Sequence, residues 1–155
     1  MRVETATSAD AEALTELRLA YLRDDHGDLD EETENTLRRC LPEYFREHLN
    51  RDLFAFAARE GGTIVSCAFL LLVEKPMSPA FMNGKTGQVL NVYTRPSSRR
   101  KGYARSVMLA LLSKAEELGL SPVELKATEE GYPLYLSVGF EDDQSEYRHM
   151  KRKYR

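Results

Sequence analysis

The sequence contains few cysteines, glycines and prolines, and it has no long hydrophobic run. Its two cysteines, Cys40 and Cys67, match no metal-ligand or redox spacing, so we interpret them as free thiols and expect a cytoplasmic protein. Nine glycines and six prolines among 155 residues exclude a fibrous or disordered chain. The longest apolar run, Ala68 to Val73, is too short to span a bilayer, and no charged stretch leads into an apolar run at the N-terminus. We therefore expect neither secretion nor membrane insertion, and a single domain over residues 1–155.

The charged residues are segregated along the chain, although the net charge is only −3. Residues 95–105 hold five basic residues and no acid, residues 148–155 hold five more basic residues, and residues 24–34 hold seven acids. Such blocks usually form solvated faces. The segment 95–105 is nevertheless a candidate anion site, and Lys and Arg clusters can also bind nucleic-acid backbones. The sequence pI of about 5.7 argues against nucleic acid as the partner.

Three long segments have the apolar periodicity of helices. The first follows Ser8, which we expect to be its N-cap. The second covers residues 37–49, and Pro42 should kink or divide it because proline lacks the N–H of a helical hydrogen bond. The third starts at Gly102, and Gly119 stands where a C-terminal cap is expected.

Alternating or β-branched apolar segments predict strands between these helices. The turn Glu60-Gly61-Gly62 joins two of them into an antiparallel hairpin. In a later strand we expect Val89, Asn91 and Tyr93 to share one face. The predicted order β-α-α-β-β-β-α-β-α-β indicates one mixed sheet flanked by helices. Its strands are expected over residues 2–6, 53–59, 63–73, 86–94, 123–127 and 146–152, with a short last helix over 131–138.

The segment that leads into the third helix has the parts of a phosphate-binding turn. Free N–H groups at a helix start carry partial positive charge, and Gly102 and Ala104 would let a phosphate approach the backbone closely. Arg99, Arg100 and Lys101 add to the positive field. By itself, such a turn is often only a well-packed helix start.

The motif Arg99-x-x-Gly102-x-Ala104 resembles the (Gln/Arg)-x-x-Gly-x-(Gly/Ala) signature of the GNAT acyltransferases. Downstream, the segment Leu134-Tyr135-Leu136-Ser137-Val138-Gly139-Phe140 looks like the family's helix with a tyrosine and a closing Gly-Phe pair. The motifs support the resemblance over about residues 88–140, whereas residues 24–50 carry no family signature.

The resemblance implies a GNAT-like α/β fold: a mixed, mostly antiparallel sheet flanked by helices. Two central parallel strands, 86–94 and 122–127, would splay apart and leave a wedge for acetyl-CoA. The pantetheine arm would pair with the backbone at the end of the first of these strands, and the pyrophosphate would lie on the amides of the following turn. The cofactor-binding residues implied in this way are Val92, Tyr93, Thr94, Arg99, Arg100, Lys101, Gly102, Tyr103, Ala104 and Arg105.

The resemblance also implies an N-acetyltransferase whose acceptor, a primary amine, attacks acetyl-CoA directly in a ternary complex. Tyr135 would be the catalytic residue beside the CoA sulfur, and the backbone N–H of Val92 would be the oxyanion donor. Many relatives carry a carboxylate on the strand before the signature, but residues 88–94 provide none. A water chain is therefore the expected proton route, with Glu129 and Glu130 as candidate anchors.

Two other functions are compatible with parts of the sequence. An acyl-CoA-binding sensor without turnover would explain the missing strand carboxylate, and a nucleic-acid-binding module would use the basic segments. We predict neither a metal nor a membrane or nucleic-acid partner. The identity of the acceptor and the existence of a homodimer stay open, and the acidic segment 24–34 favours cationic acceptors.

Overall fold

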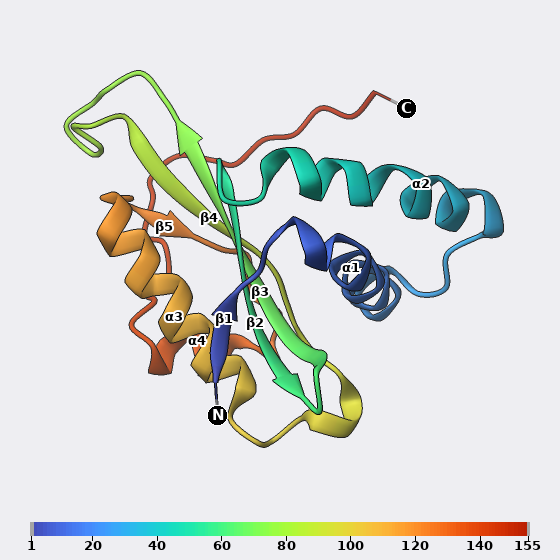
Figure 1. Ribbon diagram of the computed structural model, residues 1–155. Helices are drawn as coiled ribbons and strands as arrows, with labels where there is room; N and C mark the ends of the chain where they lie inside the picture. Colours follow the sequence, from blue (N-terminus) through green and yellow to red (C-terminus); the bar gives the residue numbers. More distant parts are fainter. Residues whose placement is uncertain (1, 155) are drawn as a thin grey trace.

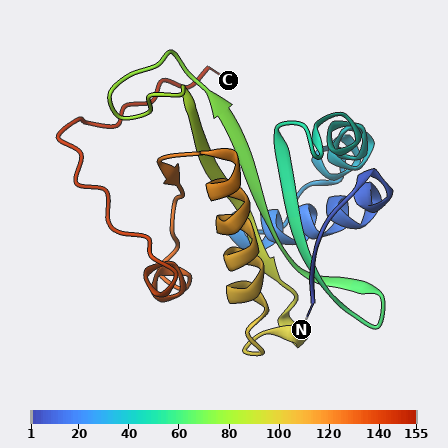
Figure 2. The ribbon, with the colours of Figure 1, turned by 60° about the vertical axis from the view of Figure 1, so that its left-hand side comes forward.

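The structure, a computed structural model, describes residues 2–154, which form a five-stranded sheet with helices on both faces (Figures 1 and 2). The strands lie in the order β1-β2-β3-β4-β5; the first four pair antiparallel, and β5 pairs parallel with β4. The predicted fold class is thereby confirmed. The elements are β1 (Val3–Thr5), η1 (Ser8–Asp10), α1 (Ala11–His26), α2 (Glu31–His48), β2 (Leu53–Glu60), β3 (Thr63–Glu74), β4 (Lys85–Thr94), η2 (Pro96–Ser98), α3 (Tyr103–Leu118), β5 (Val123–Glu124) and α4 (Tyr132–Ser137), where η denotes a 3-10 helix.

The sheet separates two hydrophobic cores. The helices α1 and α2 cover one face, where Leu14 and Phe45 are fully buried, and α3 and α4 lie on the other, where Leu70 and Leu111 are fully buried (Figure 2). Because successive side chains of a strand point to opposite faces, every residue from Leu53 to Ala58 is buried in one core or the other. The hairpin of β2 and β3 is thus the centre of the molecule.

The strand β4 contains a β-bulge. Two of its residues, Asn91 and Val92, oppose the single residue Ala68 of β3, and Asn91 has a φ of +55°. In an unbroken strand Val89 and Tyr93 would share a face, but Val89 packs in the core under α3 and Tyr93 packs in the core under α1. The predicted alternation, with Val89 on the face of Tyr93, is therefore wrong, because the bulge exchanges the two faces.

The two parallel strands separate after a short contact. Only Gly87 and Gln88 of β4 pair with Val123 and Glu124 of β5. The fifth strand, expected over residues 123–127, therefore ends at Glu124, and the chain then continues to α4 without pairing with β4 again. From Val89 to Thr94, the edge of β4 that faces away from β3 has no strand partner within residues 2–154.

The helix α2 continues through Pro42, so the predicted division into two helices is wrong, and the alternative, a kink at Pro42, stays a prediction. Proline removes one helical hydrogen bond, but the next turn is anchored by Phe45, whose side chain is 1% exposed in the core beneath α1 and α2. Packing of the apolar stripe on both sides of the proline outweighs the single missing hydrogen bond.

The predicted closing strand over residues 146–152 is also absent. Residues 141–154 have no helix or strand and are exposed throughout, with Met150 at 91%. Charged side chains occupy both faces of the alternating pattern in this segment, so neither face has enough apolar surface to attach it to the sheet.

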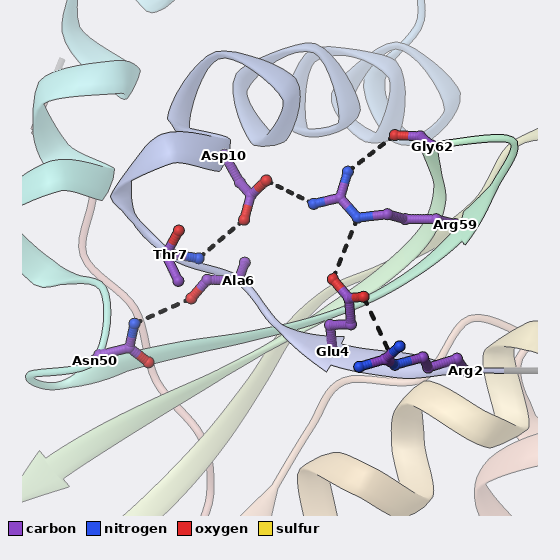
Figure 3. Close-up of polar contacts among 8 residues, drawn as sticks. All are labelled: Arg2, Glu4, Ala6, Thr7, Asp10, Asn50, Arg59 and Gly62. Atoms are coloured by element: carbon purple, nitrogen blue, oxygen red, sulfur yellow. Dashed lines mark hydrogen bonds and ion pairs between the residues drawn. The ribbon is translucent and has the colours of Figure 1, made fainter.

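A polar network around Arg59 joins the first strand and the first helices to the hairpin (Figure 3). The Arg59 guanidinium donates from Nη2 to Asp10 Oδ1 at 2.6 Å and from Nη1 to the Gly62 carbonyl at 3.0 Å. Its Nε lies 3.4 Å from Glu4 Oε2, and Asp10 Oδ2 accepts the Thr7 N–H at 2.9 Å. One guanidinium thereby holds β1, η1 and the hairpin turn together.

The N-cap of α1 is Asp10, so the prediction of Ser8 as the N-cap is wrong. The helical segment starts with the 3-10 turn Ser8–Asp10, and α1 begins at Ala11. Burial raises the pKa of Asp10, but the Thr7 N–H and the Arg59 guanidinium outweigh it and place the pKa below its ordinary value. The carboxylate is therefore more favourable in the folded chain than in water.

We expect Asp10→Asn to lower the free energy of unfolding by about 1–2 kcal/mol at neutral pH, because hydrogen bonds to a charged group are the stronger ones. A lowered folded-state pKa contributes stability that is present above the unfolded-state pKa of about 3.9 and is lost as pH falls through the folded-state value. Denaturant unfolding of both proteins should therefore show a difference that shrinks towards about pH 2.5. A difference that stays constant with pH would assign the effect to packing.

Candidate functional site

A cavity of about 560 Å³ lies where β4 and β5 separate. The end of β4 forms one wall, and the turn between β4 and α3 forms the next. The C-terminal half of α1 and the segment that leads into α4 complete it. Four parts of the chain that are distant in sequence thus meet at the gap in the sheet.

Residues Val92, Tyr93 and Thr94 line the cavity at the unpartnered edge of β4. Backbone N–H and C=O groups at such an edge can pair with an extended ligand as they would with another strand. The Thr94 carbonyl already accepts a hydrogen bond from Arg99 Nε at 2.9 Å. An extended ligand would therefore pair first with the backbone of Val92 and Tyr93.

The turn into α3 presents backbone N–H groups to the cavity. Arg100 and Gly102 both have left-handed backbone conformations, with φ of +63° and +85°. The Ser106 N–H donates back to the Gly102 carbonyl, so the amides of residues 103–105 precede the first hydrogen bond of the helix and have no intrahelical partner. Such amides, at the positive end of a helix dipole, form an anion-binding site.

Two arginines of this turn are held by polar partners beside the cavity. Arg99 Nη2 donates to Asp24 Oδ2 at 3.0 Å, which links the turn to the end of α1. Arg105 Nη1 donates to Ser137 Oγ at 2.8 Å, which links the start of α3 to the end of α4. Both side chains line the cavity, so positive charge lies on the same wall as the free amides.

Tyr135 lines the cavity from α4. Its ring packs edge-on against Phe140, with centroids 6.0 Å apart, and covers Gly131. A Cβ at Gly131 would lie 2.9 Å from Tyr135 Cε2, so only glycine leaves the ring in this position. Burial and, secondarily, the nearby Tyr21 raise the pKa of Tyr135. The phenol therefore stays protonated at neutral pH and can donate a hydrogen bond.

The helix α1 contributes Tyr21, Asp24 and Asp25 to the cavity, and Glu130 reaches it from the segment before α4. Burial, followed by the negative charge of Asp25, raises the pKa of Tyr21. Asp24 is bound by the arginine of the turn, whereas Asp25 contacts only the neighbouring His26, at 3.3 Å, among the ion pairs of residues 2–154. This wall of the cavity is aromatic and acidic.

The family model described as the acetyltransferase (GNAT) family matches residues 12–140. The chain belongs to the GNAT acetyltransferase family. Membership implies acetyl transfer from acetyl-CoA. A comparison with curated proteins finds no match.

Solved structures of GNAT proteins share the fold over nearly the whole chain. A predicted acetyltransferase from Clostridium acetobutylicum, solved with acetyl-CoA, is 26% identical, with a TM-score of 0.81 over 97% of this chain and 95% of that one. A GCN5-related N-acetyltransferase from Ralstonia eutropha is 24% identical, with a TM-score of 0.78 over 96% and 97%. A ribosomal-protein-alanine N-acetyltransferase from Brucella melitensis is 23% identical, with a TM-score of 0.67 over 97% and 100%.

The cavity contains Tyr135 and every cofactor-binding residue inferred from the GNAT resemblance except one. Lys101 does not line it, because its Nζ lies 3.6 Å from Glu60 Oε1 on the hairpin. The inference missed Tyr21, which continues the buried stripe of Leu14 and Leu17 along α1 and reaches the cavity. The helical spacing identified this stripe, but it did not indicate which end of α1 would approach β4.

No cluster of three or more histidine, cysteine, aspartate or glutamate side chains within residues 2–154 is arranged to hold a metal ion. Over the same residues, no helix combines the length and the apolar character that crossing a membrane requires.

The turn predicts a specific effect of Gly102→Asp. A carboxylate at this position would repel an anion from the free amides of α3, so the rise in melting temperature caused by acetyl-CoA should disappear. For wild type, a ligand at a hundredfold excess over Kd stabilises the fold by ~2.7 kcal/mol. The measurement is a thermal melt with and without acetyl-CoA.

Gly62→Asp is the matched control, because Gly62 has a φ of +84°, close to that of Gly102, and does not line the cavity. Both variants should melt lower than wild type without ligand, since an aspartate is strained at positive φ. An acetyl-CoA shift that survives in Gly102→Asp would place the anion elsewhere.

Proposed function

We propose that this GNAT protein transfers an acetyl group from acetyl-CoA to a primary amine by direct attack in a ternary complex. The main observation in support is that one cavity combines the unpartnered edge of β4, the free amides of α3 and the protonated Tyr135. These are groups that can bind an extended thioester, hold its phosphates and stabilise a departing thiolate.

In this proposal the pantetheine arm lies along β4 as an additional strand and pairs with the backbone of Val92 and Tyr93. The pyrophosphate lies on the amides of residues 103–105, next to Arg99 and Arg105. The course of the chain supports this placement, because β4 leads through η2 into the free amides of α3. An extended molecule on the edge of β4 would thus have its phosphates at the positive end of the helix.

The backbone N–H of Val92 is the proposed donor to the thioester carbonyl oxygen, where negative charge develops as the amine attacks. Tyr135 is the proposed donor to the sulfur that leaves. With a thiol pKa of roughly 8.5 and a phenol pKa of about 10, complete proton transfer is uphill by ~2 kcal/mol, and the raised pKa of Tyr135 increases this cost. A hydrogen bond to the thiolate is therefore favoured over a free phenolate.

The proton of the attacking amine leaves through water in this proposal. No residue of β4 from Gln88 to Thr94 has a carboxylate. Of the two glutamates considered from the sequence, Glu130 lines the cavity and Glu129 does not. Asp24 is engaged by Arg99, so Glu130 and Asp25 are the cavity carboxylates that could anchor a water chain to bulk solvent. We assign this role to Glu130, which lies on the same segment as the helix that carries Tyr135.

We expect Tyr135→Phe to lower kcat by ~10²-fold, within the ~10²–10⁴ typical of a positioned acid, because the variant keeps the ring but loses the donor. The Kd of acetyl-CoA should stay within about threefold of wild type, since the edge-on packing with Phe140 is retained. Initial rates with a thiol-reactive dye and calorimetry with acetyl-CoA measure the two quantities.

Tyr132→Phe is the matched control for this prediction, because Tyr132 lies on the same helix, binds Asp142 at 2.8 Å and does not line the cavity. Its kcat should equal that of wild type. If Tyr135→Phe also retains its kcat, the tyrosine is a packing residue; if wild type binds acetyl-CoA but acetylates no amine in a broad panel, the chain is a sensor.

The acidic wall formed by α1 supports a cationic acceptor. We expect Asp25→Asn to raise KM for an aliphatic diamine by about fivefold, which corresponds to the ~1 kcal/mol between unit charges about 4 Å apart in water. KM for an aromatic amine that is neutral at the assay pH should not change. The effect on the diamine should decrease at high salt.

Asp28→Asn is the control for Asp25→Asn, because Asp28 belongs to the same acidic segment but does not line the cavity. Equal KM changes in the two variants, or equal changes for both classes of amine, would contradict a local role for the acidic wall.

A further inference from the structure

One buried polar side chain next to the cavity has no role in the proposed mechanism so far, that of Asn91. It is 3% exposed, it lies at the β-bulge of β4, and it directly precedes the cavity-lining residues Val92 to Thr94. A buried amide inside a hydrophobic core is unfavourable unless its donor and acceptor groups are satisfied.

Both ends of the Asn91 amide have partners. Oδ1 accepts from Arg18 Nη1 at 3.2 Å, and Nδ2 contacts Cys67 Sγ at 3.5 Å. The Cys67 thiol is itself within 3.7 Å of the Asn91 carbonyl, and burial raises its pKa to about 12, so it stays a neutral thiol. Side chain and backbone of Asn91 are thus held at once by β3 and by α1.

The backbone conformation explains why the residue is asparagine. With φ at +55°, Asn91 is left-handed, a conformation that asparagine, aspartate and glycine adopt most readily. Glycine would allow the bulge without fixing it, whereas asparagine combines the same tolerance with two side-chain contacts.

Arg18 has few partners that compete with Asn91 for its guanidinium. It is half-buried on α1, it lies within 4 Å of no carboxylate among residues 2–154, and its guanidinium is 5.8 Å from the ring centroid of Tyr21. Arg18 therefore connects the bulge of β4 to the helix that carries Tyr21 and the acidic wall of the cavity.

We propose that Asn91 is a positioning residue: held between Arg18 and Cys67, it fixes the bulge that directs the free edge of β4, from Val92 to Thr94, towards the bound acetyl donor. The inference rests on the proposed function, because the cavity must bind acetyl-CoA for this edge to matter. Asn91 does not line the cavity and touches no reacting atom; it acts through the backbone that follows it.

Asn91→Gly and Asn91→Asp test the proposal together. Glycine keeps the left-handed conformation and removes both contacts, so the Kd of acetyl-CoA should rise about tenfold. Aspartate keeps the size, the backbone tolerance and the acceptor for Arg18, so its Kd should stay within about threefold of wild type. Arg18→Met removes one of the two contacts, so it should raise the Kd by more than Asn91→Asp but by less than Asn91→Gly, and in the Asn91→Gly background it should have no further effect.

Gln88→Gly is the control for a general weakening of the strand, because Gln88 is an exposed residue of β4 outside the bulge, and glycine retains the backbone groups through which it pairs with Glu124. It should lower the melting temperature by a few degrees, as glycine does within strands, and leave the Kd of acetyl-CoA unchanged. Equal Kd values for Asn91→Gly and Gln88→Gly would overturn the positioning role. If Asn91→Gly does not fold, the comparison of Arg18→Met with Asn91→Asp decides in its place.

Amide hydrogen exchange in the absence of ligand separates this inference from the proposed function. Asn91→Gly should accelerate exchange at Tyr93, which pairs with Cys67 of β3 just beyond the bulge, at least tenfold relative to Gln88→Gly, whatever the protein binds. Unchanged exchange would overturn the role of Asn91 in fixing the bulge. Accelerated exchange in a protein whose wild type does not bind acetyl-CoA would refute the proposed function and leave the role of Asn91 in the bulge intact.

Discussion

The cavity depends on how far β4 and β5 pair. Two parallel residue pairs hold the strands together at one end, and from Val89 to Thr94 that edge of β4 has no strand partner among residues 2–154. Leu120 and Val123 pack closely over Gly87, where a Cβ would meet both side chains at 3.3 Å, so the joined end is tightly fixed. The open end is kept apart by the bulge on one side and by the chain leading to α4 on the other. A sheet with longer pairing would close the cavity.

Positive and negative charge lie on different walls of the cavity. Cationic side chains and free amides lie at the start of α3, and carboxylates lie on α1 and before α4. The Arg99–Asp24 pair bridges these two sets and neutralises part of each charge. Arg105 is held by a neutral hydroxyl instead, so its full charge remains available to an anion.

Local sequence signals predicted much of the fold, and the family motifs predicted most of the residues that line the cavity from β4, α3 and α4. The helix from Gly102 to Gly119 and the hairpin around residues 60–62 depend on neighbouring residues, and both were predicted nearly to the residue. The bulge at Asn91 was not predicted, because it is defined by the register with β3. The same holds for Tyr21, whose place in the cavity depends on how α1 packs across the sheet.

Two errors had a common physical cause. The expected division of α2 at Pro42 and the expected closing strand over residues 146–152 were both inferred from local preference alone. In α2 the burial of Phe45 outweighs the proline, whereas after residue 140 the alternating pattern has too little apolar surface to secure pairing. Local sequence preference predicted the structure correctly only where tertiary packing favoured the same structure.

Among residues 2–154, the two hydrophobic cores lie on opposite faces of the sheet, and its strands contribute residues to both. The core beneath α1 and α2 lies behind the acidic wall, and the core beneath α3 and α4 lies behind the start of α3 and Tyr135. A change of volume in one core reaches the other only by moving the backbone of the sheet, which is stiff because both of its faces are close-packed. Mutations that remodel the α1–α2 half can therefore accumulate while the other half is preserved. The two walls of the cavity can thus change largely independently of each other.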